Sequence, residues 1–258
     1  MLTAGLDALI LASRPQLGQR GAVRFLTDFH VPSRAAYVVL FPEGTPQLLT
    51  LNKAEQYIAQ EASGFDKVHY ALDAGEGLAS IIKSSGGSMR TIGIAGLKST
   101  MSFADYESLT QRCPGIKFVD ATRVLDAARV IKSEAEITQI RQSYAVADAV
   151  YRTYLDFIKP GIQEIELHAE AERTLRLMGA CDSLIFVTSG PTNLCVSSAT
   201  TRRLQRGDLV TLWIEVAGPD GFWVERGGMV SLGPPTDEGK MLFDVTLDAT
   251  LACGRALR

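Results

Sequence analysis

The first half of the chain alternates short apolar runs with polar stretches that contain Gly and Pro, a pattern that predicts mixed strands and helices. Its clearest signal is the β-branched and aromatic run at 35–41, which is followed by turn-forming residues at 42–46 and by a second apolar run at 47–51. This order is typical of a β-hairpin. Further strands are expected at 6–11, 23–27, 91–95 and 117–119, and helices at 52–63, 77–84 and 102–112.

The helix at 52–63 is predicted from the spacing of its apolar residues. Its apolar residues recur at helical spacing, at Ala54, Tyr57, Ile58 and Ala62. Strands and helices in this order predict a compact α/β domain that ends near Asp126.

From Arg129 onward the pattern changes to longer helices. Ser133-Glu134-Ala135-Glu136 fits a capping box at the start of a long helix that Lys159-Pro160-Gly161 ends. The apolar stripe of this helix is Ile137, Ile140, Tyr144, Ala147, Tyr151, Tyr154 and Ile158. A second helix is expected from Glu164 to near Gly179, then strands at 183–188, 209–216 and 222–230, and a final helix at 237–255.

The composition is that of an ordinary globular protein. Of 258 residues, 46% are hydrophobic and 21% charged, which excludes a disordered or collagen-like chain and suits one large or two ordinary domains. No apolar run approaches the roughly 20 residues that cross a bilayer, so no membrane association is expected. The start of the chain lacks a basic segment before its short apolar stretch, so no secretory signal is expected.

Charge, cysteine and histidine content exclude further classes of protein. The formal net charge is −3, which provides no electrostatic footprint for nucleic acid. The four cysteines form no CxxC pair, which indicates reduced thiols in a cytoplasmic protein. Three histidines in all exclude a His-rich metal centre.

Two short motifs allow a functional and a structural interpretation. The stretch from Gly93 to Ser99 looks briefly like a phosphate-binding loop, but Leu97 stands where that loop needs a glycine before the lysine, so a plain strand and turn is favoured. Glu164, His168 and Glu172 share one helix face and could ligate a metal. A solvated acidic face is favoured, since no strand-borne ligand is identified to complete a site.

Two further candidates lie between the predicted strands of the second half. Cys195 could be a nucleophile, but no histidine lies near it in the sequence, so a buried thiol is favoured. Arg202, Arg203 and Arg206 form a basic cluster that would attract a carboxylate, although such a run is more often a solvated face.

The most informative residues are Glu215 and Glu225, which interrupt two otherwise apolar strands. A carboxylate on the inside face of a sheet is costly unless it is paired or binds a metal. An odd-numbered connection would place the two glutamates directly across from each other on one face, and an even-numbered one on opposite faces. The alternative is that Glu225 pairs with Arg226 or Arg202 while Glu215 faces solvent.

Several motifs, in this order and spacing, resemble the creatinase, prolidase and Xaa-Pro aminopeptidase family over nearly the whole chain. They are the segment 123–136, Lys159-Pro160-Gly161, Ser189-Gly190-Pro191-Thr192-Asn193, Gly207-Asp208-Leu209-Val210 and Asp220-Gly221-Phe222, with 24–29 and 35–41 in the first domain.

The resemblance implies an α/β N-terminal creatinase-type domain of ribonuclease-H-like topology at 1–126, followed at 127–258 by the first half of an α+β pita-bread domain. Family peptidases hold two divalent metals, here Mn, Co or Zn, with two hairpin aspartates, one histidine and two glutamates. A bridging water then attacks the peptide bond before proline. Creatinase itself hydrolyses a C–N bond of a guanidino-type substrate without metal.

This chain departs from the peptidase pattern at three positions. The second hairpin aspartate falls on Glu225, and the first falls on Ile214, or on Glu215 if the hairpin is one residue shorter. A family histidine falls near Val196. These two glutamates are therefore the expected metal ligands, and the catalytic residues stay unassigned.

The largest departure is at the end of the chain, where the family continues with the second half of the pita-bread sheet. We therefore expect a C-terminally shortened form with an incomplete active site. The rival hypothesis is a non-catalytic binding or assembly protein on the same scaffold. Because half a sheet leaves edges and an apolar face uncovered, a homodimer is expected.

Overall fold

The computed structural model describes residues 4–193 and 195–257. The chain forms two compact units, Met1–Ser133 and Glu134–Arg258, so it divides somewhat after the position near Asp126 that the sequence suggested. Among the described residues, no helix has both the length and the apolar character needed to cross a bilayer.

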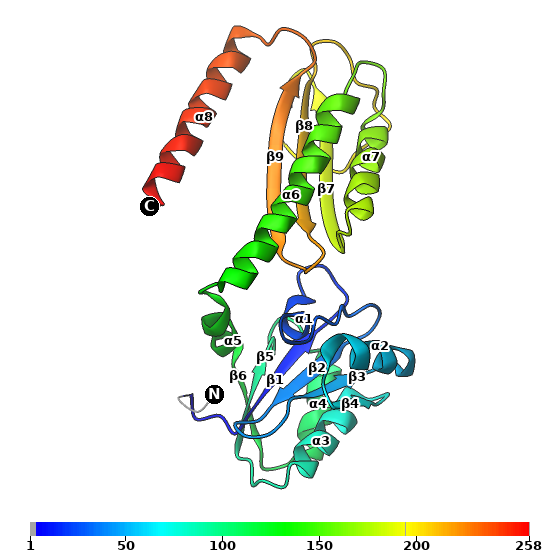
Figure 1. Ribbon diagram of the computed structural model, residues 1–258, viewed down its shortest axis with the longest axis vertical. Coiled ribbons are helices and arrows are strands. Elements are labelled where there is room, and N and C mark those ends of the chain that lie inside the picture. The colour runs from blue at the N-terminus through cyan, green and yellow to red at the C-terminus, as the bar shows by residue number, and fades with distance from the viewer. Residues whose placement is uncertain (1–3, 194, 258) are drawn as a thin grey trace. The chain divides into compact units, whose positions relative to one another are not determined.

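The first unit is built on one six-stranded sheet (Figure 1). Its strands are β1 (Ala8–Ser13), β2 (Ala36–Leu40), β3 (Gln47–Thr50), β4 (Lys67–Tyr70), β5 (Thr91–Ala95) and β6 (Lys117–Asp120), in the order β4-β3-β2-β1-β5-β6. β2 and β3 form the predicted antiparallel hairpin, and β1 pairs in parallel with β5. The predicted strands at 91–95 and 117–119 are confirmed as β5 and β6.

Helices cover both faces of this sheet. They are α1 (Gly21–Thr27), α2 (Lys53–Ser63), α3 (Ala74–Ser84), α4 (Phe103–Arg112) and α5 (Thr122–Arg129). One core packs α3 and α4 against side chains such as Ile10 and Ile94, and the other packs α1, α2 and α5 against Leu9 and Leu11. Successive strand residues point to opposite faces, so β1 contributes to both cores.

The predicted strand at 23–27 is wrong, because these residues form helix α1. Val23 and Thr27, one helical turn apart, are the buried residues. The Val23 amide donates to Ser13 Oγ at the start of the helix, and Asp28, with φ 53°, ends it in the left-handed conformation. An apolar run this short does not distinguish the helical from the strand period.

The helix at 52–63 is confirmed as α2, but its expected apolar face is wrong. Asn52 caps α2 by accepting from the Ala54 amide, and the buried residues are Glu55 and Ala59. Tyr57 and Ile58 are 71% and 57% exposed.

The strand-and-turn interpretation of Gly93 to Ser99 is confirmed. β5 ends at Ala95, and Gly96, with φ +86°, accepts from the amides of Thr100 and Met101. A Cβ on Gly93 would lie 2.6 Å from Ala121, so close packing accounts for this glycine.

The second unit has a three-stranded antiparallel sheet with the strand order β7-β8-β9. Its elements are α6 (Glu134–Phe157), α7 (Glu164–Leu177), β7 (Asp182–Gly190), β8 (Leu209–Ala217), β9 (Trp223–Ser231) and α8 (Asp237–Ala256), which confirms the predicted order. α6 and α7 pack on one face of the sheet around Leu212, Ile214 and Val216. The buried residues of α6 include Ala147 and Tyr154 as predicted, whereas Tyr144 is 47% exposed.

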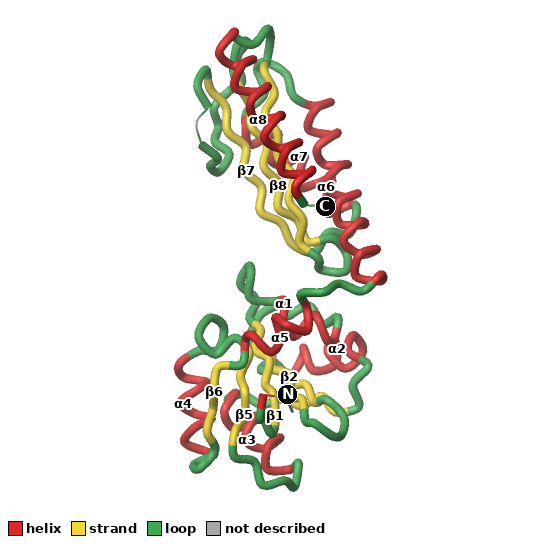
Figure 2. The backbone as a smooth tube through the Cα atoms, turned by 90° about the vertical axis from the view of Figure 1, so that its left-hand side faces the viewer, coloured by secondary structure: helices red, strands yellow, loops and turns green. Residues whose placement is uncertain are grey.

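The other face of this sheet is called the open face below. Because side chains alternate along each strand, it includes Asp182, Leu184, Phe186, Thr188, Thr211, Trp213, Glu215, Trp223, Glu225, Gly227 and Met229. Figure 1 shows α8 beside the edge strand β9, and Figure 2 shows the same helix in front of the strands, on the viewer's side. None of the residues of α8, all of which are described, is buried.

Candidate functional site

Glu215 and Glu225 lie directly opposite each other on β8 and β9. The strands are joined by residues 218–222, which is the odd-numbered connection that the paired arrangement requires. Both carboxylates belong to the open face, where Glu215 is half-buried and Glu225 is exposed. Ile214, the other position suggested for the first family aspartate, is fully buried in the core beneath α6 and α7.

Two like charges directly opposite on neighbouring strands repel each other. The arginines that were the alternative partners of Glu225 are paired elsewhere. Arg226 forms an ion pair with Asp148 and lies 4.7 Å from the centre of the Tyr151 ring, and Arg202 pairs with Asp208. The alternative pairing is therefore wrong, and the acid pair is suited to a bound cation.

Aromatic side chains surround this acid pair. The Trp213 ring lies over Gly227, where an added Cβ would come within 2.7 Å of Trp213 Cε3. Gly227 follows Glu225 by two residues and so lies on the same face. Trp223, two residues before Glu225, is 40% exposed. The open face thus combines negative charge with apolar surface, a combination that marks binding sites.

The row Glu164, His168 and Glu172 on α7 is not a metal site. Glu172 accepts from Ser183 Oγ and pairs with Arg176, while Glu164 accepts from Ser189 Oγ. In the part of the chain that the structure describes, no three His, Cys, Asp or Glu side chains are placed to hold a metal ion. The solvated interpretation is also wrong for Glu164, which is 3% exposed.

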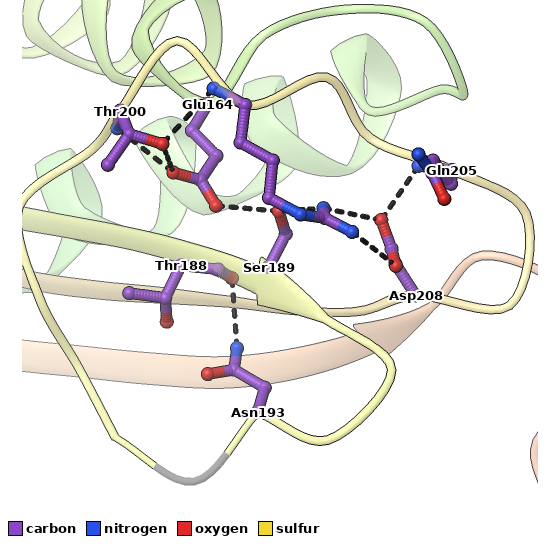
Figure 3. Close-up of polar contacts among 8 residues, drawn as sticks. Glu164, Thr188, Ser189, Asn193, Thr200, Gln205 and Asp208 are labelled. Atoms are coloured by element: carbon purple, nitrogen blue, oxygen red, sulfur yellow. Dashed lines mark hydrogen bonds and ion pairs between the residues drawn. The ribbon is translucent and has the colours of Figure 1, made fainter.

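A polar network surrounds Glu164 at the start of α7 (Figure 3). Its carboxylate accepts from Ser189 Oγ at 2.6 Å and from the Thr200 amide and hydroxyl at 2.9 and 2.6 Å. Arg202 donates to Ser189 Oγ at 2.5 Å and to both oxygens of Asp208 at 2.6 and 2.8 Å. Arg202 is therefore not part of a solvated face.

The network favours the charged forms of its acids. Burial acts to raise the pKa of Glu164, but the bonds from Ser189 and Thr200 outweigh it and hold that pKa below its ordinary value. The bonds from Arg202 lower the pKa of Asp208. Sequence spacing did not reveal this network, because its members meet only when the connection between β7 and β8 folds back onto α7.

The same connection approaches the open face through Asn193 and Cys195. Asn193 Nδ2 donates to the Thr188 carbonyl at 2.9 Å and to Thr211 Oγ1 at 3.0 Å. Thr188 Oγ1 donates to the Cys195 carbonyl at 3.0 Å. The predicted burial of Cys195 is wrong, since this residue is exposed. Val196, which stands at the family histidine position, is 45% exposed.

Two family models match the chain in succession. The creatinase/prolidase N-terminal domain matches residues 1–131, and metallopeptidase family M24 matches residues 138–258. The uncharacterized peptidase YqhT of Bacillus subtilis is 27% identical over 95% of this chain and 66% of its own length. The Xaa-Pro dipeptidase of Pyrococcus horikoshii is 23% identical over 95% of this chain and 65% of its own length.

Solved structures show the same architecture. The X-Pro aminopeptidase from Thermotoga maritima matches 96% of this chain and 67% of its own, with a TM-score of 0.82 and 21% identity. The prolidase from Pyrococcus horikoshii matches with a TM-score of 0.79 and 22% identity. The chain therefore spans about two thirds of the length of these relatives, and the fold expected from the resemblance is confirmed.

Proposed function

Because the chain belongs to the creatinase/prolidase family of M24 metallopeptidases, we propose that it serves the hydrolysis of a C–N bond in a small peptide of the Xaa-Pro type. The observation that carries this proposal is the placement of Glu215 and Glu225 directly opposite each other on the open face. Two carboxylates in this position attract a divalent cation such as Mn²⁺, Co²⁺ or Zn²⁺.

The carboxylates of Glu215 and Glu225 suit a divalent metal ion, but they supply only part of its ligands. Divalent ions take about four to eight ligands, so two carboxylates need additional donors to complete the site. Bound there, a divalent ion would supply Lewis-acid activation of water. The chain's own contribution is to hold two carboxylates across a strand pair and to offer an aromatic surface, including Trp213 and Trp223, for the apolar part of a peptide.

A titration calorimetry experiment with Mn²⁺ tests this assignment. We expect Glu215→Gln and Glu225→Gln each to weaken Mn²⁺ binding at least tenfold, because either change removes a charged donor. Glu238→Gln, on the exposed helix α8, is the matched control and should bind like the unmodified chain. Unchanged affinity in both open-face variants would contradict the proposal.

The second candidate function is binding without metal-dependent turnover, or a metal-independent creatinase-like reaction on a guanidino-type substrate. The observation that favours it is Val196, whose apolar side chain cannot donate a hydrogen bond to a substrate as the family histidine would. Hydrolysis of glycyl-proline that depends on added Mn²⁺ supports the first function. Binding of that peptide without hydrolysis supports the second.

We also propose that the protein is cytoplasmic and forms a homodimer. β7 and β9 are edge strands, and α8 exposes Leu242, Phe243 and Val245 at 56%, 61% and 62%. Such edges and apolar surfaces are normally covered by a partner. Sedimentation that shows a stable monomer without binding of an apolar dye would contradict the dimer.

A further inference from the structure

The connection between β7 and β8, described at 191–193 and 195–208, passes around the edge strand β7 and is called the connector below. Thr188 and Ser189 are neighbours on β7, so their side chains point to opposite faces of the sheet. The first part of the connector is anchored to Thr188 on the open face, and a later part is anchored on the helix side, where Thr200 donates to Glu164 and Arg202 donates to Ser189.

On the helix side the anchor is Glu164. Its buried carboxylate accepts from Ser189 and from both donors of Thr200, and Arg202 links Ser189 to Asp208 (Figure 3). Backbone bonds extend the attachment, since the Glu164 amide donates to the Arg202 carbonyl at 3.0 Å. Buried charges held by several short hydrogen bonds favour a single conformation.

On the open face the connector covers one end of the sheet. Thr188 and Thr211 belong to that face, yet each is only 8% exposed, and both are hydrogen-bonded to Asn193 or Cys195. Thr211 lies four residues from Glu215 on β8, which places this end about 13 Å from the acid pair. An extended peptide of roughly four residues covers that distance.

We propose that Glu164 is a positioning residue that fixes the connector as a wall at one end of the open face, and that this wall limits the length of the peptide lying along it. The inference rests on the proposed function, because it takes a peptide as the ligand. Glu164 does not touch the ligand. It acts through Ser189 and Thr200, which couple the helix side of the sheet to the wall.

The test compares Glu164→Gln with Glu170→Gln, a control on the same helix whose carboxylate pairs with Arg173 at the surface. Thr200→Val is a milder variant that removes one donor and keeps the charge. We expect the amide hydrogen of Thr200 to exchange with solvent about tenfold faster in Glu164→Gln, since its hydrogen bond to a charged carboxylate is lost. The Cys195 thiol should be alkylated faster in the same variant, with a smaller change in Thr200→Val and none in Glu170→Gln.

The peptide-length readout separates positioning from a purely structural role. The unmodified chain should bind glycyl-proline more tightly than a hexapeptide that begins with the same two residues, and Glu164→Gln should reduce this preference at least threefold. Should Glu164→Gln fail to fold, Thr200→Val carries both measurements. Exchange, alkylation and length preference that stay at their unmodified values in the folded variants would overturn the proposal. If the unmodified chain binds neither peptide, the proposed function and the length limit both fail, and the exchange rates still decide whether Glu164 fixes the connector.

Discussion

The two sheets of this protein differ in how much of their surface is covered. The sheet of the first unit has helices on both faces, and its central strand β1 is buried along its whole length. The sheet of the second unit has α6 and α7 on one face and the open face on the other. The first sheet is thus covered on both faces, and the second has acidic and aromatic side chains on the face that α6 and α7 do not cover.

This comparison predicts where substitutions destabilise the protein most. Ile94→Ala in the first unit removes a fully buried side chain and should lower the free energy of unfolding by about 2–5 kcal/mol. Ile58→Ala, at a position that is 57% exposed, should change it by less than about 0.5 kcal/mol. Urea denaturation measures both, and equal losses would contradict the assigned cores.

Among polar residues of the second unit, substitution of Arg202 is expected to lower the free energy of unfolding most. Arg202→Ala leaves the carboxylate of Asp208, whose side chain is 4% exposed, without its ion pair. The expected loss is about 1–3 kcal/mol, whereas Arg206→Ala, at an exposed position, should cost less than about 0.5 kcal/mol. Similar melting curves for the two variants would show that the network does not stabilise this unit.

The covered and open faces also explain which parts of the fold were predictable. Buried strands such as β2 appear as continuous apolar runs, so they were found from the sequence with nearly correct bounds. The run at 23–27 was misassigned because five residues are too few to distinguish a helix from a strand by their spacing. The helix is instead set by contacts that the spacing does not show: the Val23 amide donates to Ser13 Oγ, and the left-handed Asp28 ends the helix.

The candidate site was predictable to a similar extent. The acid pair was found because glutamates in apolar strands are costly, and the loop parity gave a condition that the register meets. The network around Glu164 was missed because the bonds to Glu164 come from residues that lie 25 and 36 positions away, and no local period relates them.

Acidification should lower the free energy of unfolding by less than these core and ion-pair substitutions do. The pKa values of Glu164 and Asp208 lie below the ordinary 4.5 and 3.8, so both carboxylates stabilise the folded state above those values. That stabilisation is lost as the pH falls through the lowered pKa values. The stability difference between the unmodified chain and Glu164→Gln should therefore shrink between pH 7 and pH 3. A difference that does not depend on pH would contradict the charged state of Glu164.

The smallest change in stability should come from a substitution on the open face. Glu225→Gln removes a repulsion between opposite carboxylates and should stabilise the metal-free protein by a few tenths of a kcal/mol, less so in high salt. Thermal melting at two salt concentrations measures this gain. A loss of stability would indicate that Glu225 has a favourable partner in the folded chain.

The most direct test of the account is a double-mutant cycle between Glu215 and Glu225 in Mn²⁺ affinity. If both carboxylates hold one cation, each single change to glutamine should remove most of the affinity, and the double variant should lose little more than either single variant. Additive losses, or affinity that survives in the double variant, would show that the two residues do not form a common site.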